Sequence, residues 1–87
     1  MSAEVSKAEV DAIVGALVDA WCERRDLRAL RIILPAYPMP MGLSEDWYRL
    51  RDALVFVRAE CRDALPASER DQLEHVIALV DAALVRY

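Results

Sequence analysis

Residues 47–65 read WYRLRDALVFVRAECRDAL, and the apolar side chains of this stretch recur at steps of three and four. Read as a helix, the stretch places one stripe of side chains on a single face, consisting of Trp47, Leu50, Leu54, Val57, Cys61 and Leu65. This spacing is typical of a helix that packs against other helices. Val55 and Phe56 lie off the stripe, so the middle of the helix is apolar on every side. The pattern predicts a helix that is central in a bundle or covered by a second chain.

Further apolar stripes of helical spacing lie on both sides of this helix, and nothing in the chain alternates as a strand does. Together the stripes predict helices over about residues 3–24, 26–34, 44–65 and 68–86. A chain of 87 residues forms one domain, so we treat residues 1–87 as a single helical domain. The sequence therefore predicts an all-α, up-down bundle of three long helices and one short helix.

Helix-capping residues precede each of these stripes. Ser6 has the capping-box spacing with Glu9. Asp26, Ser44 and Ser68 are the expected N-caps of the following helices. The short helix must end before Pro35, because the residue before a proline is pushed out of the α region. Ala8, Ala12 and Gly15 form a small-residue side of the first helix, which would let another backbone approach closely.

The composition points to an apolar surface that needs a partner. Hydrophobic residues make up 56% of the chain, above the usual share of about 45–50%. A chain this short buries a smaller fraction of its surface than a large domain does, so the excess favours a homodimer or a face for another protein. The net charge of −4, with acids and bases interspersed, disfavours binding to nucleic acid.

Membrane association and export find no support in the sequence. No apolar run approaches the about 20 residues that span a bilayer. The first residues lack the basic region and apolar core of a signal peptide. We therefore expect a cytoplasmic protein with no membrane partner.

The segment 35–43 is the main candidate for an interaction surface. Tyr37, Met39 and Met41 are apolar side chains on a proline-rich loop, and loops generally lie at the surface. Aromatic and methionine side chains are favoured at protein interfaces. The alternative is that these side chains fold back as a lid over the end of the bundle. Tyr48 and Phe56 extend the candidate surface, unless the short helix or the loop covers Phe56.

Arginines form a second candidate site. Arg24, Arg28 and Arg31 share one face if helix continues through this region, and guanidinium groups grip phosphates and carboxylates well. The alternative is a solvated face paired with nearby acids. A similar stripe on the central helix has the same two interpretations and consists of Arg51, Arg58 and Arg62.

Residues that usually carry catalysis or metal binding are sparse. Cys22 and Cys61 lack CxxC spacing, and we predict that both are reduced packing residues. His75 has Asp71 four residues earlier, but two ligands without a third do not make a metal site. We therefore expect no metal, no cofactor and no catalytic residue.

These features favour a small helical protein–protein interaction module of the inhibitor, immunity, adaptor or regulator type. Its partner would be another protein, a second copy of the chain, or both. The alternative function is binding of a small anionic or hydrophobic ligand, with the arginine cluster as the polar grip.

Overall fold

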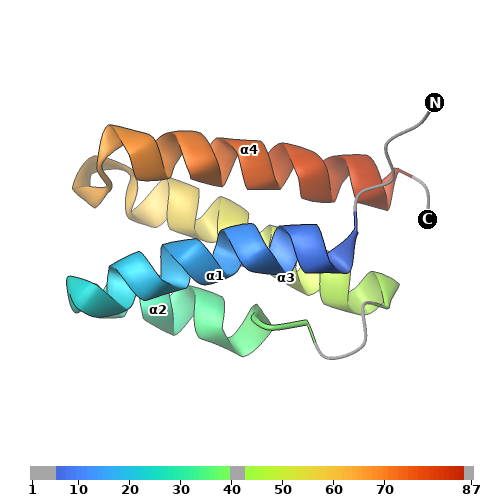
Figure 1. Ribbon diagram of the computed structural model, residues 1–87, viewed down its shortest axis with the longest axis horizontal. Coiled ribbons are helices and arrows are strands. Elements are labelled where there is room, and N and C mark those ends of the chain that lie inside the picture. Colours follow the sequence, from blue (N-terminus) through green and yellow to red (C-terminus); the bar gives the residue numbers. More distant parts are fainter. Residues whose placement is uncertain (1–5, 40–42, 86–87) are drawn as a thin grey trace.

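Four α-helices in antiparallel succession make up the described part of the computed structural model, which covers residues 6–39 and 43–85 (Figure 1). They are α1 (Lys7–Glu23), α2 (Leu27–Ile33), α3 (Ser44–Glu60) and α4 (Ala67–Leu84). Two short 3-10 turns follow α2 and α3, namely η1 (Leu34–Ala36) and η2 (Arg62–Ala64). The predicted all-α bundle of three long helices and one short helix is confirmed.

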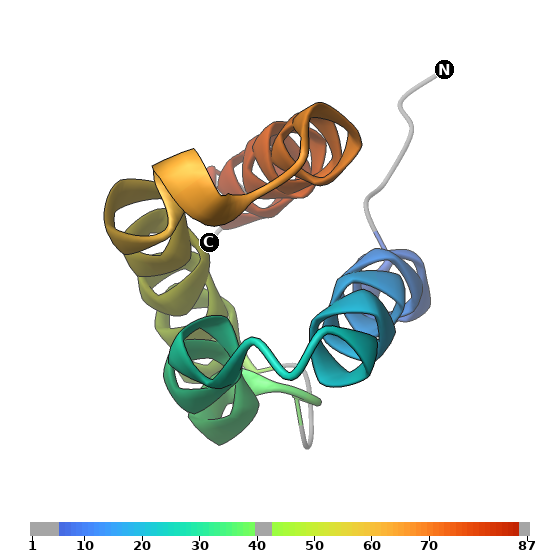
Figure 2. The ribbon, with the colours of Figure 1, turned by 90° about the vertical axis from the view of Figure 1, so that its left-hand side faces the viewer.

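The helices stand around a common core in the order α1, α2, α3, α4 (Figure 2). α1 packs against α2 and α4, and α3 packs against the same two helices. α1 and α3 therefore lie across the bundle from each other. The short α2 and η1 fill the side between them, so the connection from α1 to α3 is itself part of the bundle wall.

The central stripe of α3 faces the core, as predicted. All of its side chains are buried, including Cys61 and Leu65 beyond the end of the helix. α1 contributes a matching buried stripe, consisting of Val10, Val14, Leu17, Val18 and Trp21. Burying a large apolar side chain fully stabilises a protein by about 1.5–3 kcal/mol, so these two stripes supply much of the stability.

Two of the predicted caps form, and two do not. The Ser6 hydroxyl accepts a hydrogen bond from the Glu9 N–H at 3.0 Å, and Asp26 Oδ1 accepts one from the Ala29 N–H at 3.3 Å. Ser44 is instead the first residue of α3, which begins after Leu43. Ser68 lies inside α4, because Pro66 has the extended backbone of an N-cap and the helix starts one residue early.

The predicted helix bounds need correction at several ends. α1 begins at Lys7, because the backbone of Ser6 is extended, and residues 3–5 of the predicted range lie outside the described residues. α3 ends at Glu60 and not at residue 65, and η2 follows it. Pro66 disfavours helical geometry in the residue before it, and Leu65 is accordingly extended, but the backbone leaves the α conformation already at Cys61, whose φ is −112° and ψ is 8°. α4 ends at Leu84, two residues before the predicted end.

Candidate functional site

The predicted interface residues do not form one surface. Met39 is only 1% exposed and belongs to the hydrophobic core, so the loop folds back as the alternative interpretation allowed. Tyr37 is half-buried and packs against the core. Met41 lies outside the described residues. Met39 is therefore closed to a partner, and of the five candidates Tyr48 and Phe56 are the ones that the described structure leaves exposed.

Gly15 explains where Tyr37 lies. A Cβ atom added to Gly15 would lie 2.6 Å from the Tyr37 hydroxyl oxygen, which is too close for any real contact. The absence of a side chain at Gly15 therefore makes room for the Tyr37 ring against α1. The close approach predicted from the small residues of this helix is real, but a side chain makes it and not a second backbone.

The outer side of α3 carries the remaining aromatic candidates. Phe56 is 54% exposed and Tyr48 is 52% exposed. Eight residues of helix separate the two, which corresponds to about 12 Å along the axis. Asp52, Val55 and Ala59 lie at intervening or adjacent positions of the same helix side. We call these five residues the α3 outer face, which consists of Tyr48, Asp52, Val55, Phe56 and Ala59.

The predicted arginine cluster is largely paired with acids. Arg24 forms an ion pair with Glu69 of α4 and lies 3.5 Å from an Asp26 oxygen. The hydrogen bond to Glu69 is the main reason that the pKa of Arg24 is raised above its ordinary value. Arg28 lies 3.5 Å from Glu60, at the end of α3. Arg31 is exposed and, among the described residues, has no ion-pair partner.

Glu69 is a residue that the sequence did not single out. It is buried between α4 and α1, where its Oε1 atom accepts a hydrogen bond from the Trp21 Nε1–H at 2.9 Å. Its second oxygen accepts the hydrogen bond from Arg24. Glutamate in the first turn of a helix has the ordinary explanation of complementing the helix dipole, so the sequence carried no specific signal for this contact.

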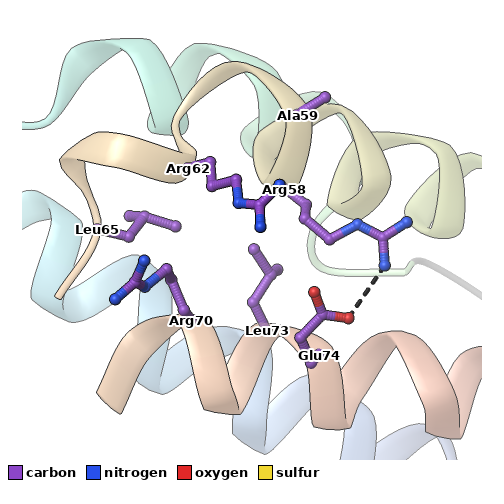
Figure 3. A pocket seen from close by; sticks show the side chains of 7 residues that line it. All are labelled: Arg58, Ala59, Arg62, Leu65, Arg70, Leu73 and Glu74. Atoms are coloured by element: carbon purple, nitrogen blue, oxygen red, sulfur yellow. Dashed lines mark hydrogen bonds and ion pairs between the residues drawn. The ribbon is translucent and has the colours of Figure 1, made fainter. Parts of the chain in front are cut away.

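A pocket opens between the end of α3, η2 and the first turns of α4 (Figure 3). Its volume is about 430 Å³. We call it the arginine pocket, and its lining consists of Arg58, Ala59, Arg62, Leu65, Arg70, Leu73 and Glu74. Arg58 and Arg62 belong to the arginine stripe recognised on the central helix. Arg70 and Leu73 come from α4, and the periodicity of a single helix does not show that residues of α4 meet the arginine stripe of α3.

The side chains around this pocket have distinct partners. Arg58 donates a hydrogen bond to Glu74 at 3.0 Å, which links α3 to α4 across the pocket. In Figure 3 the side chain of Leu73 points toward the guanidinium group of Arg62, and the guanidinium group of Arg70 lies further along the pocket, on the side of Leu65. Within residues 6–39 and 43–85, neither Arg62 nor Arg70 has an ion-pair partner.

The cysteines and the histidine occupy ordinary positions. Both thiols are free, but Cys22 is exposed and only Cys61 is a packing residue, which corrects half of the prediction. Burial raises the pKa of the Cys61 thiol. His75 is exposed. In the described part of the chain, no three His, Cys, Asp or Glu side chains gather in a way that would hold a metal ion.

Membrane spanning can be judged from the helices themselves. None of the helices described is both long enough and apolar enough to cross a bilayer.

Comparison with other proteins adds no relative. No protein-family model, curated protein sequence or solved structure matches this chain.

Proposed function

We propose that this protein is a small, non-catalytic helical module that binds another protein through the α3 outer face. The observation that carries the proposal is the exposure of two aromatic side chains on one side of a helix whose other side is fully used in the core. Aromatic residues are the commonest energetic anchors of protein interfaces. The proposal keeps the cytoplasmic location expected from the sequence.

The charges on this face restrict the kind of partner. Asp52 lies between Tyr48 and Phe56 along the helix and is exposed. A partner that offers an apolar groove for the two rings and a basic side chain opposite Asp52 would be complementary. Amphipathic helices commonly bind other proteins by placing their apolar face in such a hydrophobic groove.

The test compares variants of the α3 outer face with a matched control. The tagged 87-residue chain captures its partner from an extract of its host, and calorimetry then measures the affinity of the purified pair. Phe56→Asp and Tyr48→Asp should each weaken binding by about 30-fold, which corresponds to the 2 kcal/mol of a typical anchor residue. Circular dichroism checks that each variant is still folded.

Leu27→Asp is the control, because Leu27 is an apolar side chain of α2 that is 66% exposed. It should leave the affinity within about twofold of the original chain, as non-anchor surface positions usually do. An equal loss in Leu27→Asp and Phe56→Asp would show unspecific stickiness. Unchanged binding in both aromatic variants would overturn the assignment of the α3 outer face.

The alternative function, binding of a small anionic or hydrophobic ligand, loses its original support at Arg24 and Arg28. Both guanidinium groups are already paired with carboxylates of the same chain. The arginine pocket, which is lined by Arg58, Arg62 and Arg70, is the observation that favours binding of a small anionic ligand.

A further inference from the structure

We propose that the arginine pocket binds a small amphiphilic oxyanion, meaning a carboxylate or phosphate group attached to a short apolar chain. The pocket lies between α3 and α4 and shares only Ala59 with the α3 outer face, so ligand binding in it does not depend on the protein interaction proposed for that face. Three features support the proposal: the charge of the lining, its apolar floor and its size.

The lining carries an excess of positive charge. Three guanidinium groups and one carboxylate give it a formal charge of +2. Glu74 is the only acid that lines the pocket, and its carboxylate is engaged by Arg58. This leaves Arg62 and Arg70 as donors. Arginine binds carboxylate and phosphate oxygens through two parallel hydrogen bonds, so these two side chains suit an oxyanion.

Carboxylates that are near in sequence do not neutralise the positive charge of Arg62 and Arg70 inside the pocket. Asp63 and Asp71 follow Arg62 and Arg70 directly in the sequence. Neither aspartate lines the pocket, and both are exposed. The guanidinium groups therefore have no intramolecular partner in the described structure, unlike those of Arg24, Arg28 and Arg58.

The floor of the pocket is apolar. Leu65 and Leu73 line it, but they are only 4% and 1% exposed, so most of the apolar surface open to a ligand belongs to Ala59 and to the methylene stems of the arginines. A bare inorganic anion would contact the guanidinium groups and leave this apolar surface in contact with water. An apolar chain on the ligand would cover the stems, and burial of that surface strengthens binding.

The size fits a ligand of this class. A volume of about 430 Å³ lies within the range of about 300–1,000 Å³ that is usual for small-molecule pockets. Ala59 is the smallest of the lining residues and contributes only a methyl group.

The experiment separates the head group from the chain. Octanoate and octyl phosphate are titrated into the protein below their micelle concentrations, and NMR shift changes give the dissociation constants. Acetate and inorganic phosphate test the head group alone, and 1-octanol tests the chain alone. The amphiphiles should bind at least about tenfold more tightly than any of these three. Equal binding by inorganic phosphate, or by 1-octanol, would overturn the proposal.

Substitutions then locate the site. Arg62→Gln combined with Arg70→Gln should weaken octyl phosphate binding by about tenfold or more, because two charged donors are lost. Arg31→Gln combined with Arg49→Gln is the control, since both are exposed arginines that do not line the pocket and the pair removes the same two charges. An equal loss in the control would reduce the effect to net charge and overturn the site.

Two further measurements keep the outcome clear if an arginine variant is unstable. Ala59→Phe replaces a small lining side chain by a bulky one without changing any charge, and it should weaken the binding of octyl phosphate. Unchanged affinity would contradict the site. Co-sedimentation with phosphatidylglycerol vesicles distinguishes a lipid head group from a free ligand. Vesicle binding that requires Arg62 and Arg70, with no binding of soluble amphiphiles, would overturn the proposal in favour of a membrane surface.

Discussion

Arg25 has a backbone conformation that suits glycine better than arginine. Its φ is 56°, in the left-handed region, directly after the last turn of α1. The Asp26 N–H donates to the Trp21 carbonyl at 2.8 Å, and the Arg25 N–H donates to the Cys22 carbonyl at 3.1 Å. These two bonds form a Schellman motif, in which the left-handed position is usually glycine.

Replacing this residue by glycine should therefore stabilise the fold. We expect Arg25→Gly to raise the free energy of unfolding by about 0.5–1 kcal/mol. Relief of the left-handed strain, about 1–2 kcal/mol, exceeds the extra entropy that glycine gives the unfolded chain. Urea denaturation measures the change. Glu23 lies two residues earlier, in ordinary helical geometry, so Glu23→Gly should lower the free energy of unfolding by about 1 kcal/mol. A loss of stability in Arg25→Gly would contradict this interpretation.

The buried thiol of Cys61 should make stability depend on pH at the alkaline end. Burial raises the pKa of Cys61, so the unfolded chain loses its thiol proton at lower pH than the folded chain does. The free energy of unfolding should therefore be unaffected below the ordinary thiol pKa of about 8.5 and fall as the pH rises above it. The limiting slope is about 1.4 kcal/mol per pH unit.

Cysteine substitutions test this pH dependence between about pH 7.5 and 9.5, which brackets the ordinary thiol pKa. Cys61→Ala should remove the alkaline fall, whatever it does to stability at neutral pH. Cys22→Ala should retain the fall, because Cys22 is exposed. Parallel pH profiles of the original chain and Cys61→Ala would show that the effect comes from other groups.

At the scale of the elements, α1 and α4 are held together by one polar contact as well as by the core. Glu69 of α4 binds Trp21 of α1 and Arg24, the residue directly after α1, at the same time. Glu69→Ala should lower the free energy of unfolding by about 2–3 kcal/mol, because it leaves the buried Trp21 N–H without an acceptor and removes the charged partner of Arg24. Glu69→Gln should cost less, about 1 kcal/mol, since the amide oxygen still accepts from Trp21.

The matched control is a second glutamate of α4, five residues further along the helix and on a different side of it. Glu74 pairs with Arg58 at 3.0 Å, and both side chains are exposed to solvent. Exposed ion pairs contribute about 0–1 kcal/mol, so Glu74→Ala should change the free energy of unfolding by less than about 0.5 kcal/mol. Chemical denaturation of the three variants decides the question. Equal losses in Glu69→Ala and Glu74→Ala would rule out a special role for the Trp21 contact.

The elements themselves were largely predictable, because helix stripes and caps depend on local sequence. The stripe of α3 and the caps at Ser6 and Asp26 follow from spacing and side-chain chemistry alone. The predicted end of α3 was wrong because the apolar stripe continues to Leu65, whereas the helix ends at Glu60. Leu65 reaches the core from an extended residue after η2, so burial and helix do not end together.

At the scale of the whole molecule, sites depend on contacts between elements that are distant in sequence. Helical geometry directs Phe56 away from the stripe, but it did not decide whether the short helix or the loop covers this side chain, which the structure leaves 54% exposed. The position of Met39 could not be predicted either, since its loop had two possible courses and the packing of the chain selects the inward one. The arginine pocket needs Arg62 from η2 and Arg70 from α4, which no pattern within one helix relates.

The same α3 outer face leads to a prediction about self-association, which the sequence suggested as a homodimer. Two copies paired antiparallel through this face would place Tyr48 of one copy against Phe56 of the other, with the two Asp52 residues near the two-fold axis. Two exposed like charges within about 5 Å repel by about 1 kcal/mol, so Asp52 should weaken this pairing. Sedimentation velocity over a range of concentrations measures the association constant.

Asp52→Asn should tighten that association by about fivefold to tenfold, as loss of a repulsion of about 1 kcal/mol implies. Glu45→Gln removes the same charge from an exposed position in the first turn of α3, far from the axis, and should leave the constant unchanged. Adding Phe56→Asp to Asp52→Asn should abolish association by removing its apolar anchor. If Asp52→Asn remains monomeric at every concentration, antiparallel pairing is wrong. That result would leave a different protein as the partner of the exposed rings, as proposed for the α3 outer face.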